Sequence, residues 1–220
     1  MRLAKLSVNQ AHFNKAAPSL SNKLKTVLSA YALLLLAGLL TLQSKSVLAS
    51  DQIRIIQVTD YQEDQQLLFD SQVQFHLTDA VIEAIYNEIT LTFKTEIVFE
   101  EHQRLAGIRY RRERKHVAYN TQLSYSNFSN RYTLSNERNS KVQSFSSLDE
   151  ALKTLGTLSA FPVLNLSELH PAQKYTLRLN INLNRWRLPA PLVLNSILDT
   201  DWNLDSGWFE TRIYTPKSWL

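Results

Sequence analysis

The sequence predicts an α+β domain made mainly of antiparallel strands, in a sheet or sandwich of about seven strands with two short helices. Apolar residues alternate with polar ones in long runs, and helical spacing is confined to two short segments. Turn-forming clusters such as SNFSN and SNERNS separate the runs. Alternation by two is typical of half-buried antiparallel strands, and strands that outnumber helices indicate a sheet or sandwich that carries helices.

Strands are expected wherever the alternation is sustained. In the clearest run, Tyr175, Leu177 and Leu179 alternate with Thr176 and Arg178. Long strands are predicted over 67–77, 89–99, 117–125 and 175–183, and shorter ones over 54–58, 131–135 and 208–214.

Two segments have helical periodicity instead. Ser147 and Glu150 have the spacing of a capping box, and the apolar residues after Ser147 follow helical spacing up to Gly156. This pattern predicts a helix over 148–155. A second short helix is expected over 78–87, where an apolar stripe occurs without a capping box.

The first 49 residues are interpreted as a signal peptide or an N-terminal membrane anchor. The stretch 26–44, TVLSAYALLLLAGLLTLQS, has no charged residue, and five basic residues and no acid precede it. Val47 and Ala49 occupy the small-residue positions that signal peptidase reads, which favours cleavage. The uncharged stretch would also rise about 28 Å as a helix and could span a bilayer. Residues 50–220 are therefore expected to form a single exported β-rich domain, in the periplasm or facing it from the inner membrane.

The predicted domain is mildly acidic, although the whole chain has a formal net charge of +4. Six of the 24 Lys and Arg residues precede residue 50, whereas all 20 Asp and Glu follow it, so 18 cations against 20 acids leave −2. Such a domain lacks the general positive field of nucleic-acid-binding proteins, and no nucleic-acid partner is expected. The absence of cysteine excludes disulfides and zinc-thiolate sites.

Basic residues are concentrated in the stretch IRYRRERKHVAY, 108–119. If this strand continued backwards in register with Tyr119, Arg109 and Arg111 would point into the core, which does not tolerate unpaired charges. The buried strand should therefore begin near His116, and the preceding run should project as an exposed edge or loop, or be re-aimed by a bulge. The candidate residues for a partner or lipid surface are Arg109, Arg111, Arg112 and Arg114.

A candidate calcium loop lies near the C-terminus. Asp199, Asp201, Asn203 and Asp205 occupy alternate positions, and Glu210 is the twelfth residue. Leu204 stands where such loops have glycine, and Pro189 and Pro191 argue against a regular helix before the loop. The alternative is a polar, aspartate-rich turn that leads into a strand.

Four tryptophans, Trp186, Trp202, Trp208 and Trp219, lie towards the C-terminus. Core or sheet-edge packing is their ordinary role, but tryptophan is also favoured at interfaces. Trp202 and Trp208 are therefore added to the candidate partner surface.

The sequence contains no nucleophile elbow and no glycine-rich phosphate loop, and we expect no cofactor. The four histidines after residue 50, His76, His102, His116 and His170, do not have the spacing of a local metal pair. A hydrolase whose serine or carboxylate site is assembled between strands is kept as an alternative.

Four segments resemble, in order and spacing, the domain-of-unknown-function family 4390 of exported proteobacterial proteins. They are LSYSNFSNRYTLS (123–135), SFSSLDEALKTLG (144–156), KYTLRLNINLNRWRLPAPL (174–192) and DWNLDSGWF (201–209). Glu88 stands where the family commonly has glycine, and the stretch 109–115 is more basic than usual. The resemblance implies no known activity. Its gene neighbourhood, beside a two-component nitrogen sensor pair, implies a periplasmic accessory to a membrane sensor kinase.

The sequence thus favours a non-enzymatic periplasmic interaction module with an envelope or inner-membrane protein as partner. The alternatives are the hydrolase and a peripheral domain that binds anionic lipid through the arginine run.

Overall fold

The computed structural model describes residues 52–213, which lie within one compact unit. The predicted leader lies outside the described residues. Within 52–213, no helix is both long enough and apolar enough to span a bilayer.

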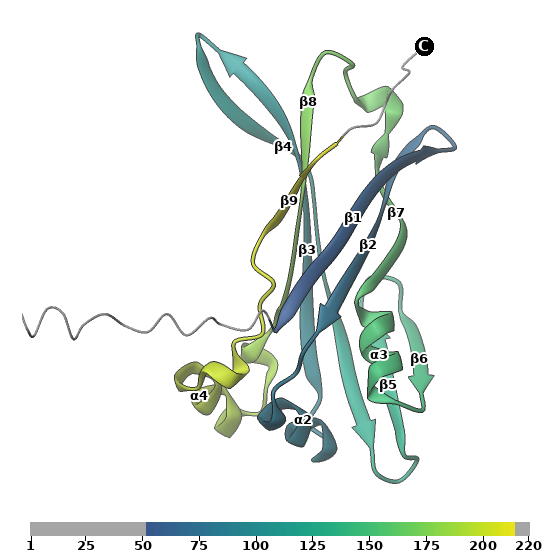
Figure 1. Cartoon of the computed structure of the whole chain (residues 1–220), viewed down its shortest axis with the longest axis vertical. Helices are drawn as coiled ribbons and strands as arrows, with labels where there is room; N and C mark the ends of the chain where they lie inside the picture. The colour runs from purple at the N-terminus through teal and green to yellow at the C-terminus, as the bar shows by residue number, and fades with distance from the viewer. Residues whose placement is uncertain (1–51, 214–220) are drawn as a thin grey trace, which may run out of the picture. The chain divides into compact units, whose positions relative to one another are not determined.

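The described chain forms two antiparallel sheets (Figure 1). The smaller sheet has the order β1 (Ile53–Glu63), β2 (Gln66–Phe75), β7 (Thr157–Asn165). The larger has the order β6 (Lys141–Phe145), β5 (Arg131–Asn136), β4 (Ile108–Ser126), β3 (Leu91–Leu105), β8 (Lys174–Leu183), β9 (Phe209–Arg212). The predicted fold class is confirmed, with nine strands rather than about seven in the described part. The two strands that were not predicted are β6 and β7. β6 is short, and Pro162 within β7 argues against a strand in the sequence.

The core lies between the two sheets. Phe75 of β2 meets Phe93 of β3 edge to face, with ring centroids 5.5 Å apart. Alternate residues of both sheets supply the rest, as expected when each sheet buries one face. Its largest fully buried members include Leu67, Phe69, Phe99, Leu123, Leu177, Leu179 and Ile181.

Within residues 52–213, three short α-helices and three 3₁₀ segments connect the strands. They are α2 (Asp79–Tyr86), α3 (Leu148–Leu155) and α4 (Ala190–Leu198), with η1 (Leu166–Glu168), η2 (Arg185–Arg187) and η3 (Thr200–Trp202). α2 and α3 match the two predicted helices, and the Ser147 hydroxyl accepts a hydrogen bond from the backbone N–H of Glu150. The expectation of no helix after Pro189 was wrong. Both prolines lie at the start of α4, where a missing N–H leaves no intrahelical bond unmade.

Two backbone positions explain residue choices in the sequence. A Cβ on Gly156 would lie 2.2 Å from the carbonyl oxygen of Val73, so α3 can pack against β2 only if this residue is glycine. Glu88 has a φ of 61°, a conformation that glycine adopts most easily.

Candidate functional site

The β3–β4 hairpin extends beyond the rest of its sheet (Figure 1). β8 pairs with β3 only as far as Lys174, opposite His102, so the residues beyond it pair only with each other. The two strands meet in a tight turn at Ala106 and Gly107, whose φ values of 49° and 86° suit the twist of a two-residue hairpin. We call residues 102–111 the hairpin end.

A β-bulge separates the hairpin end from the sandwich. Phe99 pairs with Lys115, but Glu100 pairs with Glu113, which leaves Arg114 as an extra residue on β4. Because side chains alternate with a period of two, one extra residue exchanges the two faces of the strand. The run before His116 is re-aimed by a bulge, which is one of the arrangements predicted for it, but its pairing with β3 continues back to Ile108 instead of beginning near His116.

The bulge turns Arg109 and Arg111 onto the outer face of the larger sheet. In the register they stand opposite Arg104 and His102 of β3. Lys115, just before the bulge, still points inward, and its Nζ donates a hydrogen bond to the carbonyl oxygen of Val163 at 2.5 Å. The inward charge of Lys115 is thus paired with a backbone acceptor of the opposite sheet.

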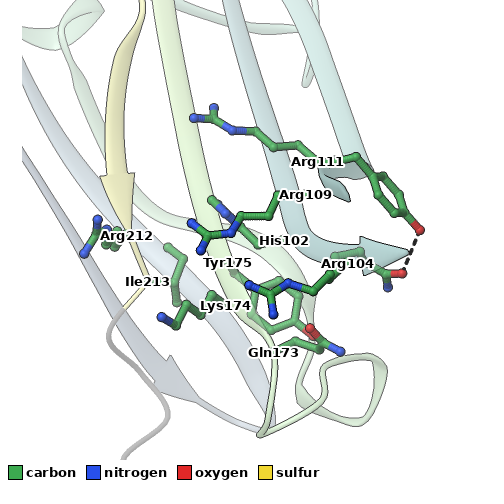
Figure 2. Close-up of a pocket in the computed structure, with 11 residues that line it drawn as sticks. His102, Arg104, Arg109, Arg111, Gln173, Lys174, Tyr175, Arg212 and Ile213 are labelled. Carbon is green, nitrogen blue, oxygen red and sulfur yellow. Dashed lines mark hydrogen bonds between the residues drawn. The ribbon is translucent and has the colours of Figure 1, made fainter. Parts of the chain in front are cut away.

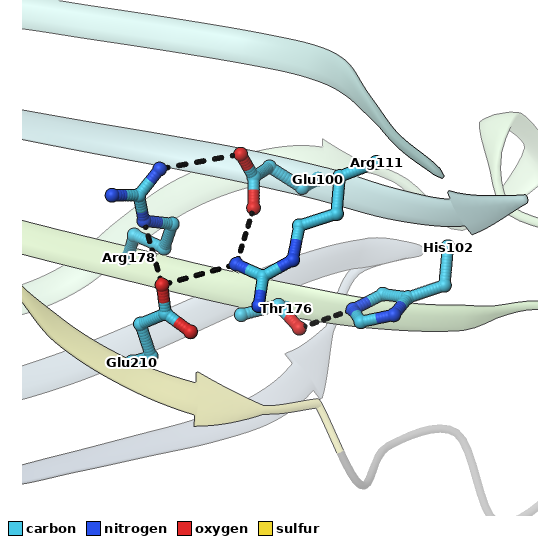
Figure 3. A network of polar contacts seen from close by, with 6 residues as sticks. All are labelled: Glu100, His102, Arg111, Thr176, Arg178 and Glu210. Carbon is cyan, nitrogen blue, oxygen red and sulfur yellow. Dashed lines mark hydrogen bonds and ion pairs between the residues drawn. The ribbon is translucent and has the colours of Figure 1, made fainter. Parts of the chain in front are cut away.

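An ion-pair network lies on the outer face at the base of the hairpin end (Figure 3). Arg111 contacts Glu100 at 3.2 Å and Glu210 at 3.0 Å, and Arg178 contacts the same two carboxylates at 3.3 Å and 3.1 Å. The Arg111 hydrogen bond holds the pKa of Glu210 below its usual value, and Glu210 and Glu100 raise the pKa of Arg111. Both acids of this network are therefore already paired.

Beyond the network lies an open pocket of about 850 Å³ (Figure 2). Its lining includes five permanent cations and a histidine, and no aspartate or glutamate among the described residues: Arg104, Arg109, Arg111, Lys174, Arg212 and His102. These residues come from β3, β4, β8 and β9. His102 is held in place by a contact of 2.6 Å between its Nε2 and the hydroxyl of Thr176. We call this arrangement the cationic pocket.

The opposite face of the hairpin end is apolar at its tip. Leu105 and Ile108 stand opposite each other beside the turn, and each is 70% exposed. Behind them Tyr110 donates a hydrogen bond to Gln103 at 2.9 Å and is 43% exposed. The hairpin end therefore has a cationic face and an aliphatic tip.

A buried ion pair lies at the edge of the core, where the hairpin extends out of it. Glu101 is 1% exposed, and the bulge residue Arg114 donates to its carboxylate at 2.9 Å and to the carbonyl oxygen of Glu168 at 3.1 Å. Burial acts to raise the pKa of Glu101, but the hydrogen bond and positive charge of Arg114 bring it below the usual value.

A family model described as "Domain of unknown function (DUF4390)" matches residues 50–212. The chain belongs to this family. No curated protein and no solved structure matches the chain. The matched region takes in both sheets and the hairpin end, so the candidate site lies within the DUF4390 domain itself.

The residues predicted to form a partner or lipid surface have different roles in the domain. Arg109 and Arg111 line the cationic pocket, and Arg112 is exposed opposite Glu101, whereas Arg114 serves the buried ion pair. Trp208 is 43% exposed and stacks on Arg178, with 4.4 Å between guanidinium and ring.

The assignment of Trp202 to a partner surface was wrong. Only 5% of it is exposed, because η3 carries its ring into the core. Trp219 lies outside the described residues.

The five residues of the candidate calcium loop are not brought together. Asp199 accepts a hydrogen bond from the backbone of Asp201 and caps η3, whereas Asp205 accepts from Asn180 and from the backbone of Gly207. Glu210 lies on β9 in the arginine network. Over residues 52–213, no group of three histidine or acidic side chains could hold a metal ion. The region is an aspartate-rich turn that leads into β9.

Sequence reasoning did not foresee four members of the cationic pocket, His102, Arg104, Lys174 and Arg212. They belong to three strands, and only the pairing of β3 with β4 and β8, and of β8 with β9, brings them beside Arg109 and Arg111. Within the sequence, the one available signal was the concentration of arginine after residue 108.

Proposed function

We propose that this DUF4390 domain is a non-enzymatic interaction module of the cell envelope and that the hairpin end is its binding surface. The observation that carries the proposal is the cationic pocket: a protruding surface with several cations and no acid in its lining. The formal charge of residues 50–220 is −2, so this concentration of positive charge is local and opposes the average of the domain.

Cross-strand pairing in the hairpin end supports a binding role. Arg104 stands opposite Arg109, and His102 stands opposite Arg111. Like charges directly opposite each other destabilise a sheet, so the pairing of Arg104 with Arg109 costs folding stability in the free domain. An anionic group placed between the arginines would offset that cost and would form charge-assisted hydrogen bonds.

The environment of the histidine in the pocket favours binding over hydrolysis. A hydrolytic site needs a nucleophile that a base activates and that a substrate can reach. His102 contacts the hydroxyl of Thr176, but Thr176 is 4% exposed and is not presented to a substrate.

The predicted leader supports the envelope setting, and the resemblance described above supports the choice of partner. A charged and partly apolar hairpin end on an exported domain suits contact with the membrane-proximal part of an inner-membrane protein. The gene neighbourhood of the family makes a sensor kinase the specific candidate for this accessory role.

Site-specific photo-crosslinking in cells tests the proposal. A photoreactive phenylalanine analogue replaces Tyr110, which is 43% exposed on the hairpin end, or Phe128, which is fully exposed at the β4–β5 turn and serves as the matched control. We expect an inner-membrane protein to be captured from position 110 and not from position 128, and mass spectrometry would identify it. Recovery of the sensor kinase would support the accessory role. Equal capture from both positions, or no capture from position 110, would contradict the proposal.

A further inference from the structure

We infer that the hairpin end seats on an anionic phospholipid bilayer, with Leu105 and Ile108 inserted among the headgroups and the arginines on lipid phosphates. This inference rests on the proposed function and specifies its surface: a membrane accessory that holds its position by contact with the bilayer itself.

The first argument is the placement of the aliphatic pair. Leu105 and Ile108 are neighbours across the hairpin and flank its turn, so they form the outermost apolar surface of this part of the domain. Moving these two side chains from water into an apolar environment would be favourable. Tyr110 lies just behind them, and tyrosine is favoured at the level of lipid headgroups.

The second argument is the order of side chains along the hairpin axis. A strand advances about 3.3 Å per residue. Arg104 and Arg109 lie one residue behind the aliphatic pair, and His102 and Arg111 lie three residues behind it. Aliphatic side chains at the tip and cations within roughly 10 Å of it match the layering of an anionic leaflet, where amphipathic segments insert about 5–10 Å. Lys174, opposite His102, extends the cationic layer onto β8.

The third argument is the local electrostatic field. Beside this layer, Glu100 and Glu210 are paired with Arg111 and Arg178, and the exposed Glu113 stands opposite Glu100. The cations of the pocket outside this network are Arg104, Arg109, Lys174 and Arg212. Electrostatic interactions are screened over about 10 Å at moderate salt. A membrane that approaches the hairpin end therefore interacts more strongly with the nearby cations than with the net charge of −2 of residues 50–220.

The size of the apolar tip favours a bilayer over a protein as the contact of Leu105 and Ile108, and the protein partner proposed above would contact the rest of the hairpin end. A stable protein interface takes roughly 20–30 residues from each partner. The apolar tip is limited to a few residues around one turn, and it projects away from the sandwich (Figure 1). A fluid bilayer can surround such a projection, whereas a protein partner would need a matching pocket.

Vesicle co-sedimentation of residues 50–220 tests the inference. This segment has its own core, whose fully buried apolar residues lie between Ile53 and Leu204, and it is the region that the family model matches. We expect binding to vesicles of equal parts phosphatidylglycerol and phosphatidylcholine and much weaker binding to phosphatidylcholine alone. Added salt should weaken the binding, and inorganic phosphate at equal ionic strength should weaken it no further.

Paired variants with matched controls separate insertion from charge. Leu105→Asn with Ile108→Asn should lower the partition coefficient on the order of tenfold or more, since two apolar side chains lose their burial. Arg104→Gln with Arg109→Gln should lower it on the order of tenfold, and Arg104→Lys with Arg109→Lys should largely retain binding. The controls are Leu194→Asn with Leu198→Asn on α4 and Arg131→Gln with Lys141→Gln on β5 and β6, all at exposed positions. These controls should leave the partition coefficient unchanged.

A probe at the tip reports insertion directly. The chain has no cysteine, so Ile108→Cys can carry an environment-sensitive dye at a single site, with Phe128→Cys as the control. We expect a blue shift on anionic vesicles at position 108 and none at position 128.

Each contrary result has a definite meaning. Binding without a blue shift, or binding that the Leu105 and Ile108 variant leaves intact, would overturn insertion. Complete competition by inorganic phosphate would assign the pocket to free phosphate instead of lipid. Failure to bind anionic vesicles while position 110 still captures a membrane protein in cells would overturn this inference and leave the proposed function standing.

Discussion

The two parts of the β3–β4 hairpin have the same backbone pairing and opposite surfaces. Within the sandwich, Phe99, Ile97 and Leu123 belong to the core and are almost fully buried. Beyond the bulge, Leu105 and Ile108 are mostly exposed, and the outer face carries arginines. Both parts are paired strands, so strand pairing alone does not determine which side chains are buried. Burial depends on whether the second sheet covers that part of the hairpin.

The boundary between the two parts is a single extra residue. Arg114 occupies the bulge and also neutralises Glu101, the last buried side chain before the hairpin end. One residue therefore ends the core and turns Arg109 and Arg111 outward. If the two parts are as distinct as this, substitutions should affect stability inside the sandwich and binding outside it.

The largest expected effect is in the buried part. Phe99 is 1% exposed and stacks on Tyr175 with ring centroids 5.2 Å apart, so Phe99→Ala should lower the free energy of unfolding by about 3–5 kcal/mol. Urea denaturation measures the loss. Ile108→Ala, at the tip, serves as the comparison and should change stability by less than about 0.5 kcal/mol. Similar losses in the two variants would remove the distinction.

The next effect is at the boundary. Arg114→Ala leaves the carboxylate of Glu101 buried without its cation and should cost about 2 kcal/mol of unfolding free energy, less than for a fully enclosed pair because Arg114 keeps 20% exposure. The double variant Arg114→Met with Glu101→Leu should recover most of the loss in the same urea experiment. A double variant as unstable as Arg114→Ala would show that the charge of Glu101 is not the cause.

A smaller effect concerns pH. The folded-state pKa values of Glu101 and Glu210 are lowered by arginine partners, so the stability they contribute is present above the ordinary carboxyl pKa of about 4.3. It should be lost as the pH falls through the lower, folded-state values. Urea midpoints between neutral and acidic pH measure this loss. Glu210→Gln should lower stability at neutral pH by less than about 1 kcal/mol, because the pair is partly exposed, and should reduce the acid-dependent change. An unchanged pH profile would contradict the ion-pair network.

The smallest effect on stability is expected at the hairpin end, with opposite sign. Arg104→Gln with Arg109→Gln removes a like-charge cross-strand pair and should raise the free energy of unfolding by up to about 0.5 kcal/mol at low salt. The gain should vanish at high salt, where the repulsion is screened. A loss of stability would show that these arginines serve the fold.

Several elements could be predicted because their signals are local. Alternation marked β2, β3 and β8, and the N-cap and apolar spacing marked α3. The strands that were missed lack such signals, since β6 has only five residues and β7 contains Pro162. α4 was missed because proline was taken as evidence against a helix, although its first turn accepts proline.

The candidate site was predicted only in part for a related reason. Arg109 and Arg111 could be assigned to the surface, because a core cannot hold them unpaired. Their neighbours in the pocket could not be identified, because Lys174 and Arg212 reach it only through the pairing of β8 with β3 and β9. Trp202 and Trp208 look alike in the sequence, and tertiary packing buries the first and exposes the second.

By itself, the sequence determined the alternating strands, the two short helices, the lack of thiol chemistry and the mildly acidic balance of residues 50–220. These properties depend on residue type and on spacing over a few positions. Only the tertiary structure decided how β3 and β4 align, where the bulge falls and which cations share a face. The physical reason is that side chains alternate with a period of two, so one bulge residue reverses every assignment of face beyond it.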